Sequence, residues 1–284
     1  MVNTKILDGK LTSEKLTEKL KLQVANLAKK PTLAVLLVGD NPASEIYVKA
    51  KLKKAQSIGF DTIFEQMSAD TAEEIILEKI EDWNTIDDIN GILVQLPLPS
   101  HLNKNKILNE IDEEKDVDGL TKFNSGSYYT GVKDCVVPCT TRGIAMLLDE
   151  YGINVEGMHA VVVGRSNLVG KPTAQMLLNR NATVTVCHSK TKDLESIIKT
   201  ADIVVSAVGE KIINGKILKN DSIVIDVGIE RRSNGKITGD VDFDSALGHA
   251  SFISPVPGGV GPMTVIALMY NLFDLYRRQQ HLLQ

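Results

Sequence analysis

The 284-residue sequence has only three cysteines, Cys135, Cys139 and Cys187, and no two of them form a CxxC pair. This spacing argues against a disulfide framework and against a structural zinc site, and it suits a reducing compartment. The histidines are equally uninformative as ligands, because they are scattered and none belongs to an HExxH motif. We therefore predict that the protein holds no metal.

Long apolar runs and basic stripes are also missing. No apolar run approaches the roughly 20 residues that span a bilayer, and the opening MVNTKILDGK lacks the apolar core of a secretory signal. The net charge is −4, and the lysines of residues 15–30 alternate with leucine and glutamate instead of forming a cationic surface. We expect a cytoplasmic protein that binds neither membranes nor nucleic acids.

What is present is the hydrophobic pattern of an α/β protein, in a chain long enough for two domains. The predicted strands are 33–38, 61–67, 91–96, 159–164, 182–188, 202–208, 222–228 and 251–254. The predicted helices cover about 11–29, 43–58, 71–83 (where TAEE has capping-box spacing), 141–151, a segment ending near 179, a segment from 193, and 263–278. Near-continuous apolar strands separated by helices indicate parallel sheets covered on both faces.

The strand HAVVV runs into GRSNLVGKP (164–172), where a helix is predicted to begin. In a Rossmann unit this junction places a pyrophosphate on backbone N–H groups at a helix N-terminus. The loop departs from G-x-G-x-x-G because Ser166 replaces the second glycine, and the loop alone is equally consistent with a plain strand-to-helix turn.

The next strand ends at His188, Ser189 and Lys190, where an NAD site would place an acidic residue on the ribose. A hydroxyl group, a cation and the nearby Arg165 suit a 2′-phosphate instead, so the chemistry favours NADP. The strands ending in SAVG (206–209) and DVGI (226–229) bring small residues to the same edge, although such glycines also occur in ordinary tight turns.

The first half of the chain carries further candidates. Tyr47 and Lys51 are four residues apart and share one helix face, a pairing usually found on surfaces. Gln95 ends an apolar strand, where a polar side chain points toward a crevice. DEEKDVDGL (112–120) reads by default as a solvated loop, and PVPGGVGPMT (255–264) is either a linker or a backbone that a planar ligand can approach closely.

Together these segments resemble the bifunctional methylenetetrahydrofolate dehydrogenase/cyclohydrolase family. The matching segments occur in the family's order and are ASEIYVKAK (43–51), GILVQLPLP (91–99), EKDVDGL (114–120), VVGRSNLVGKP (162–172), DVGI (226–229), GDVD (239–242) and PVPGGVGPMT (255–264). One departure is PCTTRG (138–143), where the family commonly has proline in place of Thr141. It alters the entry to a helix and no catalytic group.

The resemblance implies catalytic roles at the matching positions. Lys51 would be the general acid/base, and Gln95 would hydrogen-bond to it and tune its proton affinity, which desolvation in a cleft also lowers. Tyr47 would stack on the p-aminobenzoyl ring of folate, and Asp118 would accept hydrogen bonds from the pterin.

The resemblance also implies two sets of binding residues. The folate pocket would be lined by Tyr47, Lys51, Val94, Gln95, Leu96, Asp118, Pro257, Gly258, Gly259 and Val260. NADP would be held by Gly164, Arg165, Ser166, Ser189 and Ile229. Residues 1–139, completed by the C-terminal helix 264–284, would form the folate-binding catalytic domain. Residues 140–263 would form a Rossmann-type NADP-binding domain, with the catalytic cleft between the two domains.

The implied activity is oxidation of 5,10-methylenetetrahydrofolate by NADP, followed by hydrolysis of the methenyl product to 10-formyltetrahydrofolate. This chemistry belongs to one-carbon metabolism and purine biosynthesis, and the resemblance implies a homodimer. Two alternatives remain: another NADP-dependent dehydrogenase of the shikimate-dehydrogenase type, or a non-catalytic NADP-binding sensor. VQLPLP beside the Tyr47/Lys51 pair argues against the first, and the presence of Lys51 argues against the second.

Overall fold

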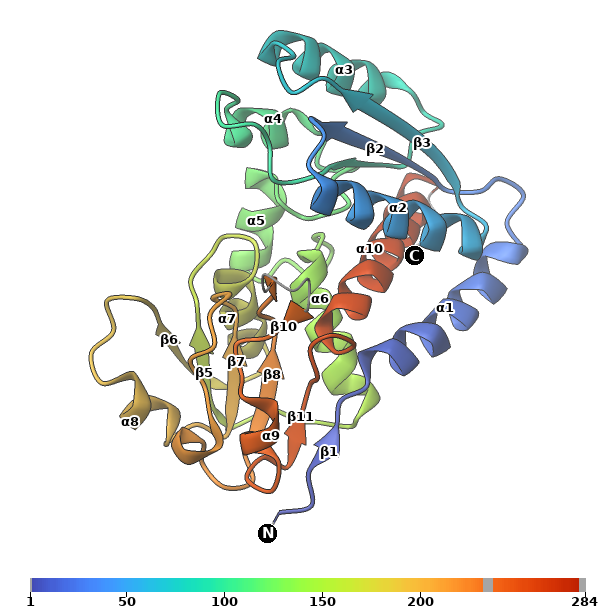
Figure 1. Cartoon of the computed structure of the whole chain (residues 1–284). Helices are drawn as coiled ribbons and strands as arrows, with labels where there is room; N and C mark the ends of the chain where they lie inside the picture. The colour runs from blue at the N-terminus through green and yellow to red at the C-terminus, as the bar shows by residue number, and fades with distance from the viewer. Residues whose placement is uncertain (1, 232–236, 281–284) are drawn as a thin grey trace. The chain divides into compact units, whose positions relative to one another are not determined.

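The structure is a computed structural model that describes residues 2–231 and 237–280. The chain divides into two compact units (Figure 1). The six-stranded unit comprises Met1–Glu14 and Thr140–Thr264, and the three-stranded unit comprises Lys15–Cys139 and Val265–Gln284. The first fourteen residues, which the sequence prediction assigned to the first domain, thus group with the second half of the chain.

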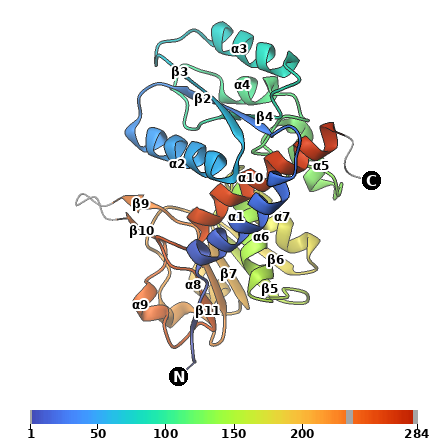
Figure 2. The same cartoon turned by 90° about the vertical axis from the view of Figure 1, so that its right-hand side faces the viewer.

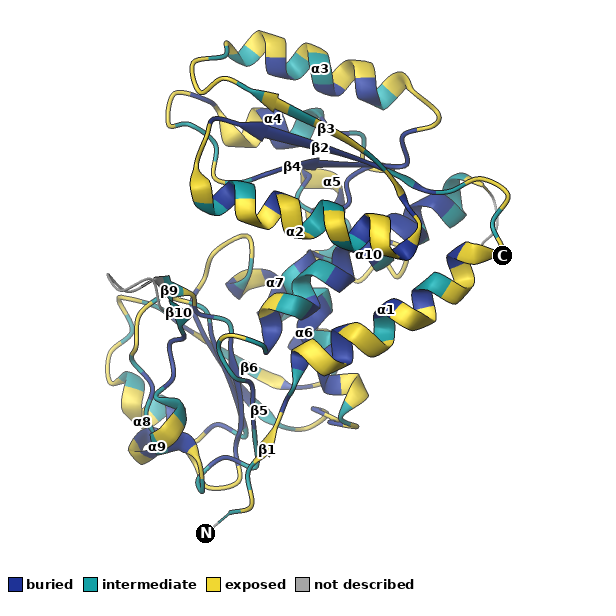
Figure 3. Ribbon diagram, turned by 45° about the vertical axis from the view of Figure 1, so that its right-hand side comes forward, coloured by how far each residue is buried: buried dark blue, intermediate teal, exposed yellow. Residues whose placement is uncertain are grey.

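The three-stranded unit is built on a parallel sheet with the order β3-β2-β4. Its strands are β2 (Thr32–Val38), β3 (Asp61–Met67) and β4 (Gly91–Val94). Alternate residues of β2 and β4 pack into one apolar core with α3 (Glu73–Thr85) and α4 (Lys104–Glu110). Helix α2 (Pro42–Ile58) lies on the other side of the sheet (Figures 1 and 3).

Helix α2 carries clear local signals at both ends. The Asn41 side chain accepts the N–H groups of Ala43 and Ser44, which would otherwise lack partners, and Pro42 occupies the first helical position. Gly59 ends the helix in the left-handed conformation, with φ of 97°. These signals fix the start and length of the helix that carries Tyr47 and Lys51.

The remaining helices of this unit frame the sheet. Helix α1 (Gly9–Ala25), whose residues from Lys15 onward belong here, lies beside α10 (Val260–Gln279), which joins the unit at Val265 (Figure 2). Tyr270 of α10 donates its hydroxyl to the carbonyl of Leu16, 3.3 Å away. Helix α5 (Lys122–Tyr129) follows the acidic 112–120 segment.

The six-stranded unit has an entirely parallel sheet with the order β1-β11-β8-β7-β5-β6. Its strands are β1 (Lys5–Ile6), β5 (His159–Val163), β6 (Thr183–Cys187), β7 (Ile203–Ser206), β8 (Ile223–Asp226) and β11 (Phe252–Ile253). Its helical segments are α6 (Cys139–Glu150, which enters the unit at Thr140), α7 (Gly170–Asn179), α8 (Leu194–Ile198), η1 (Gly215–Ile217) and α9 (Phe243–Ala246). Strands β9 (Glu230–Arg231) and β10 (Ile237–Thr238) form a separate antiparallel pair.

The predicted α/β class with parallel sheets is confirmed, but several element ends differ from the prediction. Strand β4 ends at Val94, so Gln95 lies just beyond it, and α10 begins at Val260 instead of 263. The predicted capping box at 71–74 is wrong, because α3 begins at Glu73 without a side-chain cap. The Glu73 carboxylate instead accepts the N–H of Asn103, which precedes α4.

Thr141, where the family commonly has proline, lies in the first turn of α6 and is fully buried. Its hydroxyl is 3.1 Å from that of Thr173 in α7. The departure therefore adds a polar contact between two helices of the six-stranded unit. Among the described helices, none is long and apolar enough to cross a membrane.

Candidate active site

The strand order of the three-stranded sheet marks a position for a ligand. The chain leaves β2 for β3 on one side and then crosses to β4 on the other, so the topological switch lies between β2 and β4. Open α/β sheets bind ligands outside the carboxyl ends of the strands at such a point. Here those ends are Val38 and Val94, and the next residue after Val94 is Gln95.

Gln95 and Lys51 meet at this switch point. Lys51 Nζ donates to Gln95 Oε1 over 3.0 Å, and Gln95 Nε2 donates to the carbonyl of Leu96 over 2.6 Å. Only 8% of Gln95 is exposed, and its backbone N–H donates to Leu36 of β2. A buried amide with both ends hydrogen-bonded has little freedom, so it fixes where the ammonium of Lys51 lies. Tyr47 lies one turn earlier on α2 and is 36% exposed.

Val94 and Leu96, the neighbours of Gln95, contact the core on the α3 side of the sheet. Val94 is fully part of that core, and Leu96 packs partly against it. The side chain of Val94 is therefore part of the core. Both residues hold the strand end that presents Gln95.

The segment carrying Asp118 reaches the same edge. Asp116 forms a parallel bridge with Ile92 of β4, and the Ile92 N–H donates to the carbonyl of Lys115 over 2.7 Å. Asp118 lies two residues beyond the bridge, just as Val94 does on β4. The side chain of Asp118 is half-buried, so this residue is less solvated than the default interpretation of the stretch as a solvated loop expects.

Buried polar groups hold the turn around Asp118. One oxygen of Asp116, which is 1% exposed, accepts the N–H of Thr121 at 2.9 Å and the amide of Asn124 at 3.0 Å. Burial raises the pKa of Asp116 in spite of these bonds. The Lys115 ammonium donates to the carbonyls of Trp83, Asn84 and Ile86, and burial lowers the pKa of Lys115.

The six-stranded sheet has its own switch point, between β5 and β7. Gly164 follows β5 and Ala207 follows β7. A Cβ atom on Gly164 would lie 2.6 Å from the Ala207 carbonyl oxygen, so only glycine allows this close approach. The loop predicted to hold a dinucleotide therefore begins at the position where the topology expects a ligand.

The loop from Gly164 to the start of α7, which we call the glycine loop, is tightly folded. Ser166 Oγ accepts the N–H groups of Val169 and Gly170 at 3.1 and 3.3 Å. A Cβ atom on Gly170 would lie 2.2 Å from the carbonyl oxygen of Gly164. Ser166, which replaces a glycine of the usual pattern, thus satisfies backbone donors at the start of the helix.

The other predicted cofactor residues are all exposed. Arg165 lies in the same loop, and Ser189 lies in the turn after β6, where the His188 N–H donates to Thr191 Oγ1 over 2.8 Å. Ile229, after β8, is 48% exposed. A guanidinium and a hydroxyl at this edge provide the donor set that a phosphate requires.

The segment Pro257–Val260 also belongs to the six-stranded unit. Gly258 has φ of 105°, and its carbonyl accepts the N–H of Lys10 over 2.9 Å. Gly259 and Val260 are buried, whereas Pro257 is exposed. Within its unit, the part of this segment open to a ligand is therefore Pro257 and Gly258.

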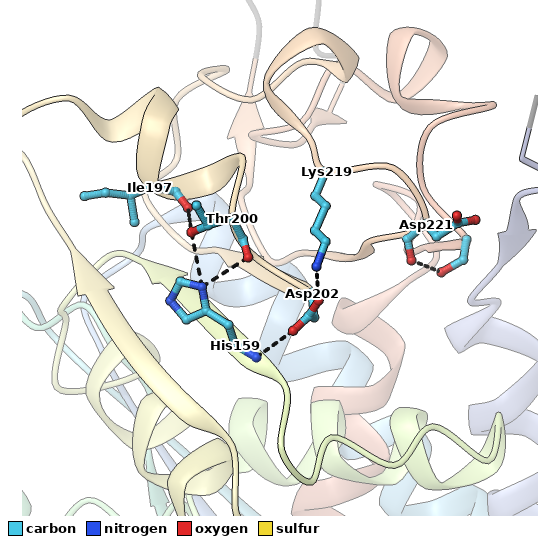
Figure 4. A network of polar contacts seen from close by, with 7 residues as sticks. His159, Ile197, Thr200, Asp202, Lys219 and Asp221 are labelled. Atoms are coloured by element: carbon cyan, nitrogen blue, oxygen red, sulfur yellow. Dashed lines mark hydrogen bonds and ion pairs between the residues drawn. The ribbon is translucent and has the colours of Figure 1, made fainter.

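The amino edge of the six-stranded sheet carries a different polar cluster (Figure 4). The His159 N–H donates to Asp202 Oδ2 over 2.8 Å, and Lys219 Nζ donates to Asp202 Oδ1 over 2.5 Å. The Lys219 ammonium and the His159 N–H hold the pKa of Asp202 below its ordinary value. This cluster joins the starts of β5 and β7 to the segment after η1, at the edge opposite the glycine loop.

No group of three or more histidine, cysteine, aspartate or glutamate side chains in the described ranges is arranged to hold a metal ion. The polar groups described at the two carboxyl edges are the Lys51 ammonium with its Gln95 partner, the Asp118 carboxylate, and the Arg165 and Ser189 donors.

Comparison with known proteins shows that the segments carrying both carboxyl edges match models of one family. The family model described as "Tetrahydrofolate dehydrogenase/cyclohydrolase, catalytic domain" matches residues 7–118, and the one described as "Tetrahydrofolate dehydrogenase/cyclohydrolase, NAD(P)-binding domain" matches residues 138–280. The chain belongs to the tetrahydrofolate dehydrogenase/cyclohydrolase family. The resemblance predicted from the motifs is thereby confirmed, and the shikimate-dehydrogenase alternative is set aside.

Individual members of this family are similar along nearly the whole chain. The bifunctional protein FolD of Streptococcus pyogenes serotype M28 is 46% identical over 283 residues, which cover 98% of this chain and 99% of that protein. The bifunctional FolD of Campylobacter jejuni has a TM-score of 0.95 at 44% identity, covering 97% of this chain and 99% of that one. The Trypanosoma brucei FolD, solved with NADP and an inhibitor, has a TM-score of 0.93 at 34% identity, covering 98% and 99%.

Sequence reasoning missed the groups that support these edges. EKDVDGL, DVGI and GDVD were recognised as motifs, but no role was assigned to Lys115, Asp116, Asp226 or Asp240. The signal was present, because acidic residues beside strand ends rich in small and apolar residues are candidates for buried carboxylates. Their partners, however, lie far away along the chain.

Proposed function

We propose that the protein oxidises 5,10-methylenetetrahydrofolate with NADP and then hydrolyses the methenyl product to 10-formyltetrahydrofolate. The observation that carries this proposal is the Lys51–Gln95 pair at the switch point of the sheet in the segment matched by the family's catalytic domain. Family membership supports both reactions, and the bifunctional relatives support their presence in one chain.

In this proposal, Lys51 manages protons for the hydrolytic step. A water that attacks the methenyl carbon must lose a proton as the C–O bond forms, and ring opening requires a proton on the departing nitrogen. Lys51 Nζ can carry that proton, while Gln95 keeps Nζ in place through the 3.0 Å hydrogen bond. Asp118, Tyr47 and the backbone near Gln95 hold the folate so that the reacting carbon meets the lysine.

The pterin and the aminobenzoyl ring of the folate have separate proposed partners. Asp118, half-buried on a turn fixed by Asp116, would accept the pterin amino and ring N–H groups, a match for a carboxylate with two oxygens. Tyr47 has an exposed ring that can stack on the aminobenzoyl group. Pro257 and Gly258, with the adjoining Gly259 and Val260, are further residues that we propose for folate binding.

The exposed donors of the six-stranded sheet fit NADP. Arg165 and Ser189 would bind its 2′-phosphate, the Gly164–Ser166 loop its pyrophosphate, and Ile229 an apolar ring face. NADP, when bound, supplies the acceptor for the hydride that leaves the methylene carbon. The protein's part in that step is to align the two carbons, which needs no proton transfer.

The assay that tests this proposal uses purified protein with 5,10-methylenetetrahydrofolate and either NADP or NAD, followed at the absorbance of the reduced nicotinamide. We expect turnover with preference for NADP, and separate hydrolysis of supplied 5,10-methenyltetrahydrofolate above the uncatalysed rate. Binding of NADP without either reaction would identify a non-catalytic NADP sensor instead. We also propose that the protein is cytoplasmic and forms a homodimer. Sedimentation equilibrium would test the oligomeric state.

A further inference from the structure

Two buried carboxylates, Asp226 and Asp240, occupy the carboxyl edge of the six-stranded sheet. Asp226 is the last residue of β8 and is 3% exposed, and Asp240, two residues after β10, is fully buried. Burying a carboxylate costs free energy unless hydrogen bonds compensate it. The donors that surround each group therefore show what the pair stabilises.

Asp240 holds the end of β7. It accepts hydrogen bonds from Ser206 Oγ at 2.7 Å, from the Val208 N–H at 2.8 Å and from the Gly209 N–H at 2.9 Å. Val208 and Gly209 follow β7 directly, on the side where Ala207 touches Gly164 of the glycine loop. Asp240 thus fixes the backbone at the switch point, although it lies more than thirty residues away along the chain.

Asp226 holds Asp240 in turn. Asp226 Oδ1 accepts the Asp240 N–H and the Gly228 N–H, both at 3.0 Å, and Oδ2 accepts the Val241 N–H at 2.9 Å. A Cβ atom on Gly228 would lie only 1.9 Å from Asp240 Oδ1, so the two strand ends are packed around these oxygens. One network therefore sets the backbone of the loops after both β7 and β8.

Each loop exposes an apolar side chain next to the network. Val208 is 41% exposed and Ile229 is 48% exposed. Gly209 has φ of 79°, and a Cβ atom there would meet nothing within 4 Å, so the space above this backbone is open. Apolar side chains and open backbone on a rigid base provide a surface on which a planar ring can pack.

We propose that Asp240 is a positioning residue for the dinucleotide: it fixes the Val208–Gly209 backbone so that a planar ring of NADP packs against the loops after β7 and β8. The inference rests on the proposed NADP-dependent activity. Asp240 is fully buried and cannot touch the cofactor, so its contribution to cofactor binding would be indirect.

The test compares Asp240→Asn with Asp242→Asn. The first change replaces one accepting oxygen by an amide that cannot accept an N–H, and the second removes the same charge at an exposed ion pair with Lys211. We expect Asp240→Asn to raise the Kd and KM for NADP about tenfold or more, as the loss of a buried acceptor predicts. Hydrolysis of supplied 5,10-methenyltetrahydrofolate, which uses no NADP, should stay at the wild-type rate. Asp242→Asn should match the wild type in both.

Amide hydrogen exchange of residues 207–211 supplies a readout that does not depend on activity. Exchange should be faster in Asp240→Asn than in Asp242→Asn. A wild-type Kd for NADP in Asp240→Asn, or a parallel fall of the hydrolase reaction, would overturn the inference while leaving the proposed function intact. A wild type that does not bind NADP would overturn both.

Ser206→Ala extends the test to a milder change. It removes only the hydroxyl that donates to Asp240 Oδ2, and the methyl group fits the same space. We expect a smaller increase in the Kd for NADP with unchanged hydrolase activity. If Asp240→Asn does not fold, this variant decides alone, and an unchanged Kd for NADP overturns the inference.

Discussion

Lys51 combines a long side chain with a fixed partner. Its Nζ is held by Gln95, whose buried amide is itself tied to the backbone of Leu96. A proton carrier placed in this way needs no large movement between accepting and delivering a proton. Its contribution should therefore be largest in the step that transfers protons, and smallest in hydride transfer.

Lys51→Met should abolish most of the hydrolase activity, because methionine keeps much of the side-chain length but cannot carry a proton. A positioned acid/base contributes about 10²- to 10⁴-fold, so we expect a loss of that order. The measurement is the disappearance of 5,10-methenyltetrahydrofolate absorbance, corrected for the uncatalysed rate. Lys49→Met is the matched control, since Lys49 lies on the same helix with a largely exposed side chain. Wild-type hydrolysis in Lys51→Met would remove the lysine from the mechanism.

Arg165→Ala should reduce the preference for NADP over NAD. Arg165 is exposed in the glycine loop, and no acidic residue ends the turn at Ser189 to bind a ribose hydroxyl. Losing a hydrogen bond to a charged group costs about 1.5–3 kcal/mol, which is roughly 10- to 100-fold in kcat/KM for NADP. Arg180→Ala is the control, because Arg180 pairs with Asp149 elsewhere in the six-stranded unit. Equal specificity constants for both cofactors in the wild type would contradict the assignment.

Among single residues, the sequence predicted those whose place is set by the helix or strand that carries them. Gln95 was a polar residue at the end of an apolar strand, and Lys51 shared a helix face with Tyr47. Asp240 could not be found in this way, because its partners Val208 and Gly209 meet it only after β7, β8 and the loop before α9 have assembled.

Among the elements, α3 ends in an unusual cap. The last carbonyls of a helix lack intrahelical donors, and here the Lys115 ammonium donates to Trp83, Asn84 and Ile86 at 2.7–3.1 Å. A cation at a helix C-terminus also interacts favourably with the helix dipole. The same residue precedes Asp116, so this cap ties α3 to the turn that presents Asp118.

Lys115→Met should destabilise the three-stranded unit by about 1–2 kcal/mol, because the carbonyl of Trp83 is buried and those of Asn84 and Ile86 are part-buried, and a buried acceptor without a donor costs about 1–3 kcal/mol. The measurement is the urea midpoint followed by circular dichroism. Lys104→Met, at an exposed position in α4, should leave the midpoint unchanged. A Lys115→Met midpoint equal to that of the wild type would mean that water replaces the ammonium at no cost.

The prediction of helices and strands succeeded where local sequence signals were strong, and it failed for elements that are short or have weak signals. The long helix α2 has Asn41 and Pro42 at its start and Gly59 at its end, and its predicted bounds differ by one residue. Strand β1 has only two residues and exists because Lys5 and Ile6 pair with β11 from the far end of the chain. Helix α5 was missed because its sequence, KFNSGSYY, is rich in residues that favour turns.

For the whole molecule, the parallel sheets were predictable from composition and alternation, but the order of their strands was not. The order β6-β5-β7-β8 creates the switch point at Gly164, and it depends on long-range pairing that no local pattern specifies. The same long-range pairing buries Asp226, which gives the stability of the molecule a pH dependence.

Burial raises the pKa of Asp226 from an ordinary 3.8 to about 6, and the neighbouring Asp240 contributes in the same direction. Between these values the folded protein holds a proton that the unfolded chain has released. This proton therefore contributes about 3 kcal/mol to the free energy of unfolding. The contribution is full below pH 4 and is lost as the pH rises through 6. The stability advantage of the wild type over Asp226→Asn should shrink from pH 4.5 to pH 7.5. Denaturant midpoints of both proteins check this, and a constant difference would contradict the raised pKa.

Ligand-induced stabilisation tests how the binding roles divide between the two units. A ligand that binds only the folded state stabilises it by about 2.7 kcal/mol at a hundred times its Kd, which raises the melting temperature. NADP and tetrahydrofolate, each added alone, should both raise the melting temperature of the wild type. Arg165 belongs to the six-stranded unit and Asp118 to the three-stranded unit, so each substitution should act on one ligand.

Arg165→Ala should reduce the shift produced by NADP and retain the shift produced by tetrahydrofolate, and Asp118→Ala should do the reverse. The reason is that Asp118→Ala leaves pterin donors unpaired, at about 1–3 kcal/mol each, without touching the glycine loop. Differential scanning fluorimetry over a range of ligand concentrations gives both shifts. Loss of both shifts in either variant would indicate a damaged fold, and retention of the tetrahydrofolate shift in Asp118→Ala would show that this carboxylate does not bind the pterin.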